Sequence, residues 1–227
     1  MKLTNLISGS KRNGEEISID RLLAAVLRDL GDAISKLKTL PGNAVTIFGS
    51  ARVAEGSPRY EAARKMAAQF AHLGYAIITG GGPGIMEAGN RGAAQAGGLS
   101  IGVNLRLPFE NGNDYQDISV SHTTFATRKL VFLSFSSAFI VMPGGFGTLD
   151  ELSEVLTHIQ TGLSRRVPVV LFERAFWKPL LAFLRESLLA EGYIKEEDFE
   201  LFHVVDSVAE AVAIVAGGNA EIELPAA

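Results

Sequence analysis

The spacing of apolar residues changes along the chain near residue 44. Between residues 17 and 38, apolar residues recur every three or four positions, which predicts an amphipathic helix that ends before Leu-Pro-Gly-Asn. After it, helical stretches alternate with the short apolar runs AVTIFG, YAIITG, LSIGVNL, AFIVM and VPVVLF. Continuous apolar strands separated by helices are typical of a mainly parallel sheet that helices cover on both faces. The pattern therefore predicts a doubly wound α/β fold with an added N-terminal helix.

This pattern divides the chain into three segments. Residues 1–43 form an N-terminal extension that contains the helix, residues 44–216 form one α/β domain, and residues 217–227 form a flexible tail. With 227 residues and 47% hydrophobic content the chain can bury a large core, and its length fits one domain better than two. The stretch HVVDSVAEAVAIV predicts a last short strand and a closing helix.

Composition excludes several classes of function. The net charge is −4 and the basic residues are scattered, which argues against a nucleic-acid partner. No apolar run is long enough for a signal peptide or a membrane span, so we expect a cytoplasmic protein without membrane contact. The sequence has no cysteine and its four histidines are isolated, so no metal site is predicted.

Two turns rich in glycine follow predicted strands. The first, TGGGPGIMEAGNRGAAQAGG, contains Gly80, Gly81 and Gly82, and the second, PGGFGTLDE, spans residues 143–151. In a parallel sheet such turns lie at the carboxyl ends of the strands, where ligands bind. Glycine lets the backbone approach a ligand, and a helix that begins there offers free N–H groups to a phosphate. The two turns together predict one anion-binding pocket.

Two missing motifs narrow the class of phosphate ligand. Neither turn is followed by Gly-Lys-Ser or Gly-Lys-Thr, so a nucleoside-triphosphate site of the Walker type is not expected. The dinucleotide fingerprint fails because Glu87 stands where the third small residue belongs, and its charge would oppose a pyrophosphate. No NAD-type cofactor is therefore predicted, and a nucleoside monophosphate fits better.

Each candidate residue also has a purely structural explanation. Gly145 and Gly147 can be turn and packing glycines. Residues 148–151, Thr-Leu-Asp-Glu, match a capping box, in which the Glu side chain would bond the N–H of the cap residue. Arg128 and Lys129, within TTFATRKLVFLSFSS, can be two ordinary cations on a solvated helix face.

Three motifs in order, GGGPGIMEAGNRGA, TRK and PGGFGTLDE, resemble the LONELY GUY family of cytokinin riboside 5′-monophosphate phosphoribohydrolases. Members of this family were often labelled lysine decarboxylases. The resemblance covers about residues 44–215 and includes a complete PGGxGTxxE signature from Pro143 to Glu151. It implies a Rossmann-like fold, in agreement with the apolar pattern, and the N-terminal helix is similar to that of the longer bacterial members.

The resemblance also implies which residues form the site. Arg128 and Glu151 are the expected catalytic pair, and Gly144 to Asp150 are expected to hold the nucleotide phosphate. The expected substrate contacts are Gly80, Gly81, Gly82, Glu110, Lys129, Gly144, Gly145, Phe146, Gly147, Thr148, Leu149, Asp150 and Thr157.

The implied reaction hydrolyses the bond between an adenine-type base and ribose 5-phosphate, without a cofactor. Breaking this bond develops positive charge on the sugar, so Glu151 can stabilise that charge and orient or deprotonate the attacking water. Arg128 is permanently cationic, so its expected role is to position the nucleotide and to support the charge redistribution as the base leaves.

Two rival functions stand beside this one. A non-catalytic carrier of a nucleotide or of molybdenum cofactor would have a similar glycine-rich pocket, although the presence of both Arg128 and Glu151 argues against it. A true lysine decarboxylase would need a Schiff-base lysine for pyridoxal phosphate, and Lys129 is the only candidate near the motifs.

The sequence also predicts self-association. Apolar positions at 124–136 and 148–162 are more numerous than one sheet face can cover, which predicts at least a homodimer. The family resemblance implies a dimer that shapes the active site, and hexamers among the longer bacterial members.

Overall fold

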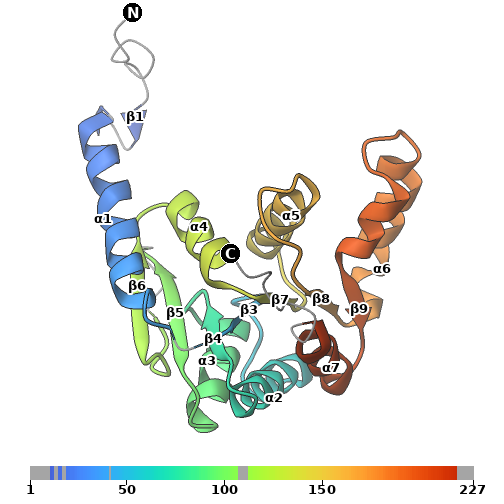
Figure 1. Cartoon of the computed structure of the whole chain (residues 1–227), viewed down its shortest axis with the longest axis horizontal. Helices are drawn as coiled ribbons and strands as arrows, with labels where there is room; N and C mark the ends of the chain where they lie inside the picture. Colours follow the sequence, from blue (N-terminus) through green and yellow to red (C-terminus); the bar gives the residue numbers. More distant parts are fainter. Residues whose placement is uncertain (1–10, 13–14, 17–18, 41, 107–111, 219–227) are drawn as a thin grey trace, which may run out of the picture.

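A seven-stranded, all-parallel sheet forms the centre of the protein, with the strand order β6-β5-β4-β3-β7-β8-β9 (Figure 1). The structure is a computed structural model that describes residues 11–12, 15–16, 19–40, 42–106 and 112–218. The strands of the sheet are β3 (Ala44–Phe48), β4 (Ala76–Thr79), β5 (Ser100–Leu105), β6 (Ile118–His122), β7 (Ala138–Val141), β8 (Val169–Phe172) and β9 (His203–Val205). A separate two-stranded pair joins β1 (Lys11–Arg12) to β2 (Glu15–Glu16).

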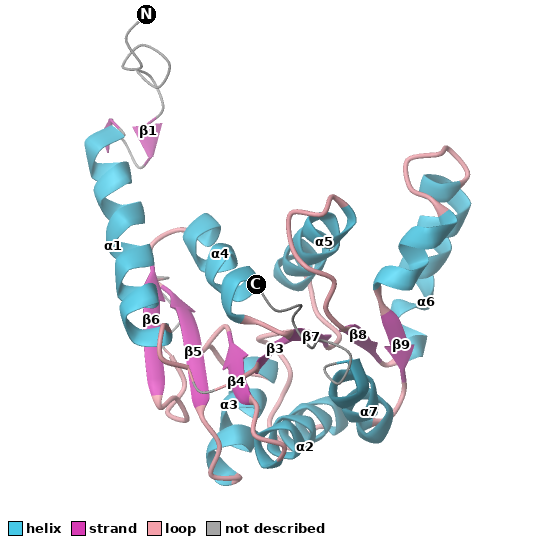
Figure 2. Cartoon of the chain, in the orientation of Figure 1, coloured by secondary structure: helices cyan, strands magenta, loops and turns pink. Residues whose placement is uncertain are grey.

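Helices cover both faces of the sheet (Figure 2). One face carries α2 (Pro58–His72), α3 (Ile85–Gln95) and α7 (Val208–Gly218), and the other carries α1 (Ile19–Leu37), α4 (Phe125–Phe135), α5 (Phe146–Gln160) and α6 (Arg174–Phe183). A π-helical segment, Leu184–Leu189, continues α6, and a 3-10 helix spans Glu196–Leu201. The predicted doubly wound α/β fold with an added N-terminal helix is confirmed.

Alternate residues of each strand enter different cores. On β3, Val45 and Ile47 pack toward α2 and α3, whereas Phe48 packs toward α4 and α5. Every residue of this strand is therefore buried, which explains why four of its five residues are apolar.

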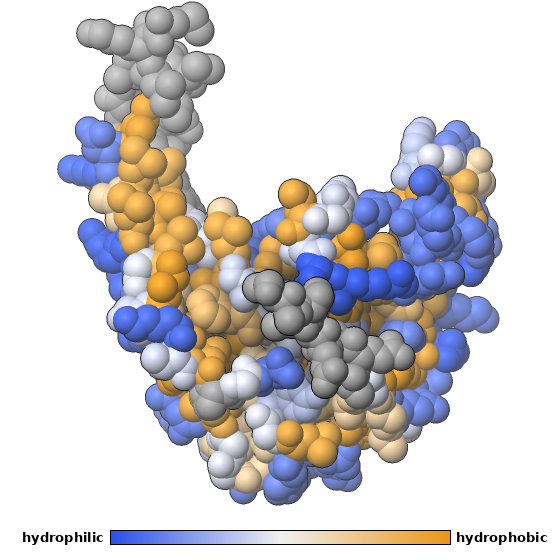
Figure 3. All heavy atoms as spheres, viewed as in Figure 1, coloured by the Kyte–Doolittle hydropathy of each residue, from blue (hydrophilic) through white to orange (hydrophobic). Residues whose placement is uncertain are grey.

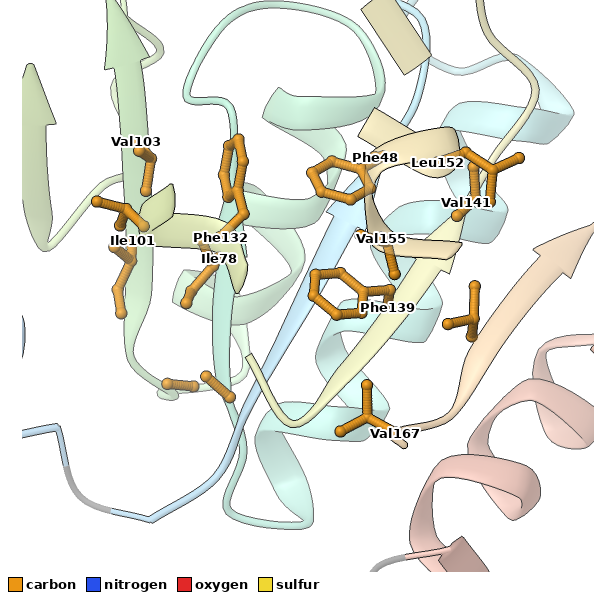
Figure 4. Close-up of a cluster of buried hydrophobic side chains, with 14 of the residues drawn as sticks. Phe48, Ile78, Ile101, Val103, Phe132, Phe139, Val141, Leu152, Val155 and Val167 are labelled. Carbon is orange, nitrogen blue, oxygen red and sulfur yellow. The ribbon is translucent and has the colours of Figure 1, made fainter. Parts of the chain in front are cut away.

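An aromatic cluster fixes α4 and α5 over the middle of the sheet (Figure 4). The ring of Phe48 meets Phe132 of α4 edge-on, with centroids 5.1 Å apart, and stacks on Phe139 of β7 at 5.8 Å. Leu152 and Val155 of α5 belong to the same buried cluster. Truncating a buried Phe to Ala typically costs about 3–5 kcal/mol, so this contact holds the two helices firmly in place.

The strand order reverses beside β3. The chain moves outward from β3 through β4 and β5 to β6, and then returns to β7 on the other side of β3. In open α/β sheets ligands bind outside the carboxyl ends of the strands at such a reversal. The ends of β3, β4 and β7 are therefore the expected place for a site.

The structure also contains elements that the apolar pattern did not predict. Strand β6 reads Ile-Ser-Val-Ser-His, which alternates as an edge strand does, and helix α6 contains Pro179 in its interior. Helix α7 runs to Gly218, so the predicted start of the tail at residue 217 is two residues early, and residues 219–227 lie outside the described part.

The predicted N-terminal helix is α1, which packs against β6 and α4. Its last turns enter the main core through Ala33 and Leu37, so the helix is attached to the α/β domain and is not a separate unit. Within the described residues, no helix has the length and apolar character needed to cross a membrane.

Candidate active site

A cavity of about 360 Å³ lies at the carboxyl ends of β3, β4 and β7. The loop after β3, residues 49–52, forms one wall, and Gly80 lies at the end of β4. The second glycine-rich turn contributes residues 145–148 and the adjacent Asp150 and Glu151. The two glycine-rich turns thus meet at one cavity, as the sequence predicts.

The loop after β3 joins the two turns. The Ser50 N–H donates to the Pro143 carbonyl at 3.2 Å, and the Ile85 N–H donates to the Ser50 carbonyl at 3.1 Å. Sequence reasoning missed this loop because it contains a single glycine, Gly49. The available signal was its position, since it follows a strand that is apolar at four of its five residues and therefore central in the sheet.

The N-terminus of α5 faces the cavity without a side-chain cap. The helix begins at Phe146, its N-cap residue is Gly145, and among the described residues no side chain caps its first turn. The first N–H groups of a helix have no intrahelical acceptor and carry partial positive charge. This end of α5 is therefore suited to bind an anion such as a phosphate.

The glycines of this turn fall into two groups. A Cβ on Gly144 would overlap the side chain of Thr148, so packing alone explains that glycine. A Cβ on Gly145 or Gly147 would meet nothing within 4 Å, and neither residue has positive φ. Neither packing within the described part of the chain nor positive φ therefore requires glycine at 145 or 147, and both positions leave open space at the start of α5.

The capping-box explanation of Glu151 is wrong as well. Because α5 begins at Phe146, Thr148 is already inside the helix and Glu151 lies in its second turn. The Glu151 side chain is only 14% exposed, and its Oε1 lies 3.9 Å from Nη1 of Arg128. Glu151 therefore points across the cavity toward Arg128.

Burial changes the acidity of Glu151. Desolvation raises its pKa to about 7, the charge of Arg128 opposes this rise, and the nearby Asp150 adds to it. A carboxyl group with a pKa near neutrality can take and release protons under physiological conditions, which is the property of a general base.

Arg128 is buried, which contradicts the alternative of a solvated cation. The residue is 8% exposed, its Nε donates to the Val103 carbonyl at 2.8 Å, and its Nη2 donates to the Gly80 carbonyl at 3.2 Å. The guanidinium also lies over the ring of Phe132, 5.3 Å from its centroid. A Cβ on Gly80 would overlap Arg128, so this glycine makes room for the arginine.

Lys129 lies beside the cavity and joins α4 to α5. Its Nζ is 3.1 Å from the Asp150 carboxylate and 2.9 Å from that of Glu154. Burial by itself would lower the pKa of Lys129, but the hydrogen bonds to Glu154 and Asp150 raise it above its usual value. The side chain is therefore an ion-paired cation that links the two helices carrying Arg128 and Glu151.

Several of the expected substrate contacts lie elsewhere. Gly81 and Gly82 do not line this cavity, and their carbonyls accept hydrogen bonds from the Asn113 side chain. Leu149 packs against the core. Thr157 is exposed and lines a different cavity beside the 3-10 helix.

Glu110, another expected contact, lies outside the described residues. The structure adds an apolar wall that the sequence did not predict, made of Met86, Leu105 and Phe125.

Comparison with known proteins relates this geometry to a family. The family model described as "Possible lysine decarboxylase" matches residues 86–215. A cytokinin riboside 5′-monophosphate phosphoribohydrolase of Mycobacterium marinum is 33% identical over 162 residues, which is 70% of this chain and 86% of that protein. The chain belongs to the LONELY GUY family.

A second relative and one solved structure are also similar to this chain. The phosphoribohydrolase of Rhodococcoides fascians is 28% identical over 176 residues, 75% of this chain and 88% of that protein. The solved structure of the molybdenum cofactor carrier protein MCP from Chlamydomonas reinhardtii is 26% identical, with a TM-score of 0.56. It covers 80% of this chain and 100% of the carrier.

The described lining of the cavity lacks a feature that lysine decarboxylation, the activity named in the family description, would require. Pyridoxal phosphate chemistry requires a lysine that forms a Schiff base at the site. The described residues that line the cavity include no lysine, and the nearby Lys129 is paired with two carboxylates. The pair at the centre of the cavity is instead Arg128 with Glu151.

Proposed function

We propose that this protein hydrolyses the N-glycosidic bond of adenine-type nucleoside 5′-monophosphates, such as a cytokinin riboside 5′-monophosphate or AMP. The observation that carries the proposal is the buried Glu151, with its pKa near 7, facing Arg128 beside an uncapped helix N-terminus. The products would be the free base and ribose 5-phosphate. The names of the related proteins support the same class of reaction.

The nucleotide phosphate fits the N-terminus of α5. Backbone N–H groups at residues 146–148 would donate to it, and the missing Cβ atoms of Gly145 and Gly147 leave it room. Glu151 lies three residues beyond Thr148, about 4.5 Å further along the helix axis at the normal rise. Its carboxyl group would therefore face the ribose rather than the phosphate.

Glu151 and Arg128 would divide the chemistry between them. As the bond from the sugar C1′ to the base nitrogen breaks, its electron pair leaves with the base and the sugar becomes an oxocarbenium-like cation. The Glu151 carboxylate stabilises that cation, and it accepts a proton from the water whose oxygen attacks C1′. The departing base nitrogen gains one proton, so that overall the hydroxyl of water ends on C1′ and a hydrogen ends on the base. Arg128 cannot act as a base, so it holds the nucleotide and stabilises negative charge in the transition state.

Product analysis tests this proposal. The purified protein would be incubated with a panel of nucleoside monophosphates, with plain and prenylated adenine bases, and the products separated by chromatography. We expect release of free base and ribose 5-phosphate from at least one adenine nucleotide by the parent protein, and not by Glu151→Gln. Absence of base release from every nucleotide would overturn the proposal.

A nucleotide or molybdenum-cofactor carrier is the second candidate function. The observation that favours it is the 26% identity to the carrier MCP over 80% of this chain. A carrier needs no carboxylate with a pKa near 7 in its pocket, so Glu151 favours the hydrolase. Tight AMP binding without any turnover would favour the carrier instead.

We also propose that the protein is at least a dimer and acts in the cytoplasm, with no nucleic-acid or membrane partner. Large apolar side chains are exposed on the face that carries α1 and α4: Leu27 is 71% exposed, Phe125 53% and Leu130 47%. Figure 3 shows apolar surface running along α1. Contiguous exposed apolar surface usually marks a protein interface. Light scattering should give a mass well above the 24.2 kDa of one chain.

A further inference from the structure

A carboxylate from α1 lies at the start of the helix that carries Arg128. Asp29 is 2% exposed, and its Oδ2 accepts hydrogen bonds from the Thr123 N–H at 2.7 Å and the Thr123 hydroxyl at 2.8 Å. It also accepts one from the Thr127 hydroxyl at 3.0 Å. Helix α4 begins at Phe125 with Thr124 as its N-cap residue. Asp29 therefore holds the first turn of α4 through Thr127, which lies 98 positions further along the chain.

The hydroxyl of Thr127 sets the direction of the remaining hydrogen bonds. A threonine hydroxyl has one hydrogen, and two acceptors lie within reach of it: the Asp29 carboxylate at 3.0 Å, which is charged, and the Thr124 carbonyl at 3.2 Å. When Asp29 accepts this hydrogen, the Thr127 oxygen can accept from the Thr124 hydroxyl at 2.9 Å and from the His122 Nδ1 at 3.1 Å.

Both ionisable groups of this network keep one charge state near neutral pH. Burial lowers the pKa of His122, which keeps it neutral. Burial alone would raise the pKa of Asp29, but the hydrogen bonds from Thr123 and Thr127 outweigh that effect and lower it. The negative charge of Asp29 also lies at the positive end of the α4 helix dipole, which stabilises the first turn.

Arg128 follows this anchored turn directly. Its N–H donates to the Thr124 carbonyl at 3.4 Å, so the backbone of Arg128 depends on the turn that Asp29 holds. Helix α1 lies before residues 86–215, which the family model matches. The added helix thus supplies a buried charge to the element that carries a proposed catalytic side chain.

We propose that Asp29 is a positioning residue that acts through Arg128 by fixing the first turn of α4. This inference rests on the proposed hydrolase function only for its kinetic test. Asp32 provides a matched control, because it lies on the same helix, is 40% exposed and pairs with Lys36. Asp32→Asn removes the same charge from α1 without touching α4.

The kinetic test is a double-mutant cycle. Asp29→Asn should lower kcat/KM by about 10- to 100-fold, since small displacements of a positioning group have effects of that size. Asp32→Asn should leave it unchanged. In an Arg128→Ala background, Asp29→Asn should cause no further loss, because the group it positions has already gone. An equal loss of kcat/KM in both backgrounds, which a smaller folded fraction would cause, would overturn the inference.

A second readout does not depend on turnover. The Arg128 Nε–H is hydrogen-bonded to a buried carbonyl, so its NMR signal, assigned by its loss in Arg128→Ala, reports the position of the side chain. Asp29→Asn should shift or broaden this signal, and Asp32→Asn should not. If the parent protein releases no base, the proposed function fails, and this signal still decides whether Asp29 positions Arg128.

Thr127 keeps the test decisive if Asp29→Asn does not fold. Thr127→Val removes the hydroxyl that donates to Asp29 at nearly constant volume, and Thr127→Ser retains it. We expect the valine variant to lose kcat/KM and to perturb the Arg128 signal, and the serine variant to remain close to the parent. Equal behaviour of the two variants would contradict the role assigned to Asp29.

Discussion

The guanidinium of Arg128 lies 3.9 Å from the carboxyl oxygen of Glu151, beyond the range of a good hydrogen bond. Arg128 instead donates to the carbonyls of Val103 and Gly80. Its charge lowers the pKa of Glu151, but burial has the larger effect and the pKa remains near 7. Burial, which the charge of Arg128 only partly offsets at this separation, therefore leaves Glu151 able to exchange a proton at neutral pH.

Glu151→Gln should make the protein inactive and more stable at alkaline pH. Below pH 4.5 the carboxyl group is protonated in both the folded and the unfolded chain, so it adds no pH dependence there. As the pH rises toward about 7, the unfolded chain releases this proton and the folded chain keeps it, so stability falls. At pH 8 the free energy of unfolding of the variant should exceed that of the parent by up to ~3 kcal/mol. At pH 4 the two values should be equal.

Denaturant titrations at the two pH values measure this gain, and base release measures the loss of activity, expected to be on the order of 10²-fold or more. Glu154→Gln serves as the control, because it removes one charge from α5 outside the cavity. The quantity compared is the difference in unfolding free energy between Glu151→Gln and the parent. If this difference is the same at pH 8 and at pH 4, the burial of this carboxyl group is contradicted.

The pH dependence of turnover should follow Glu151. If the carboxylate is the active form, kcat/KM should rise with pH and level off above about 7. The second ionisation of the substrate phosphate falls in a similar range, near pH 6, so kinetics alone would mix the two. The carboxyl carbon signal of Glu151 in carbon-labelled protein, assigned by its loss in Glu151→Gln, should titrate with the same midpoint. A Glu151 midpoint near 4.5 would exclude it as the group that controls the rate.

Alanine at Gly145 should separate binding from folding. A Cβ at this position meets nothing within 4 Å, so Gly145→Ala should keep its thermal melting temperature. The same Cβ would occupy the space where the phosphate approaches, so AMP affinity should fall by roughly tenfold or more. Gly144→Ala is the matched comparison, because its Cβ would overlap Thr148 and should lower stability. Calorimetry measures the AMP affinity of both variants, and thermal melting measures their stability. Unchanged AMP affinity in Gly145→Ala would show that the phosphate does not bind at this turn.

Alanine at Gly80 should act on Arg128. The added Cβ would overlap the guanidinium, so the arginine must leave its bonds to the Gly80 and Val103 carbonyls. We expect kcat/KM to fall toward the value of Arg128→Ala, by about 100-fold, while the helix content measured by circular dichroism stays the same. Parental kinetics in Gly80→Ala would show that the arginine tolerates displacement.

The sequence predicted the sheet and the place of the site better than it predicted the role of single residues. Strands such as β3 and β7 are almost continuously apolar because helices cover both faces, and this pattern is visible without a structure. Strand β6 was missed because an edge strand alternates. The meeting of the two glycine-rich turns followed from the parallel arrangement alone.

Contacts between distant segments could not be predicted in this way. The capping-box pattern at residues 148–151 is real in the sequence, but α5 begins earlier, at Phe146, because the Gly145 backbone turns there. The burial of Arg128 depends on Phe132 and on carbonyls of two other strands or loops. The bond between Asp29 and Thr127 joins residues far apart in the chain, and no local pattern marks either of them.

Two parts of the cavity lining, the turn at Gly145 and the apolar side chains, differ in how substitution would affect ligand binding. Around Gly145 the ligand would meet main-chain amides, which are the same whatever the amino acid, so substitution there can only obstruct the phosphate. The apolar part of the lining is instead formed by the side chains of Met86, Leu105 and Phe125, whose size and shape differ between amino acids. Substitutions at those three positions should therefore change which base is accepted, while the proposed contacts to ribose 5-phosphate stay the same.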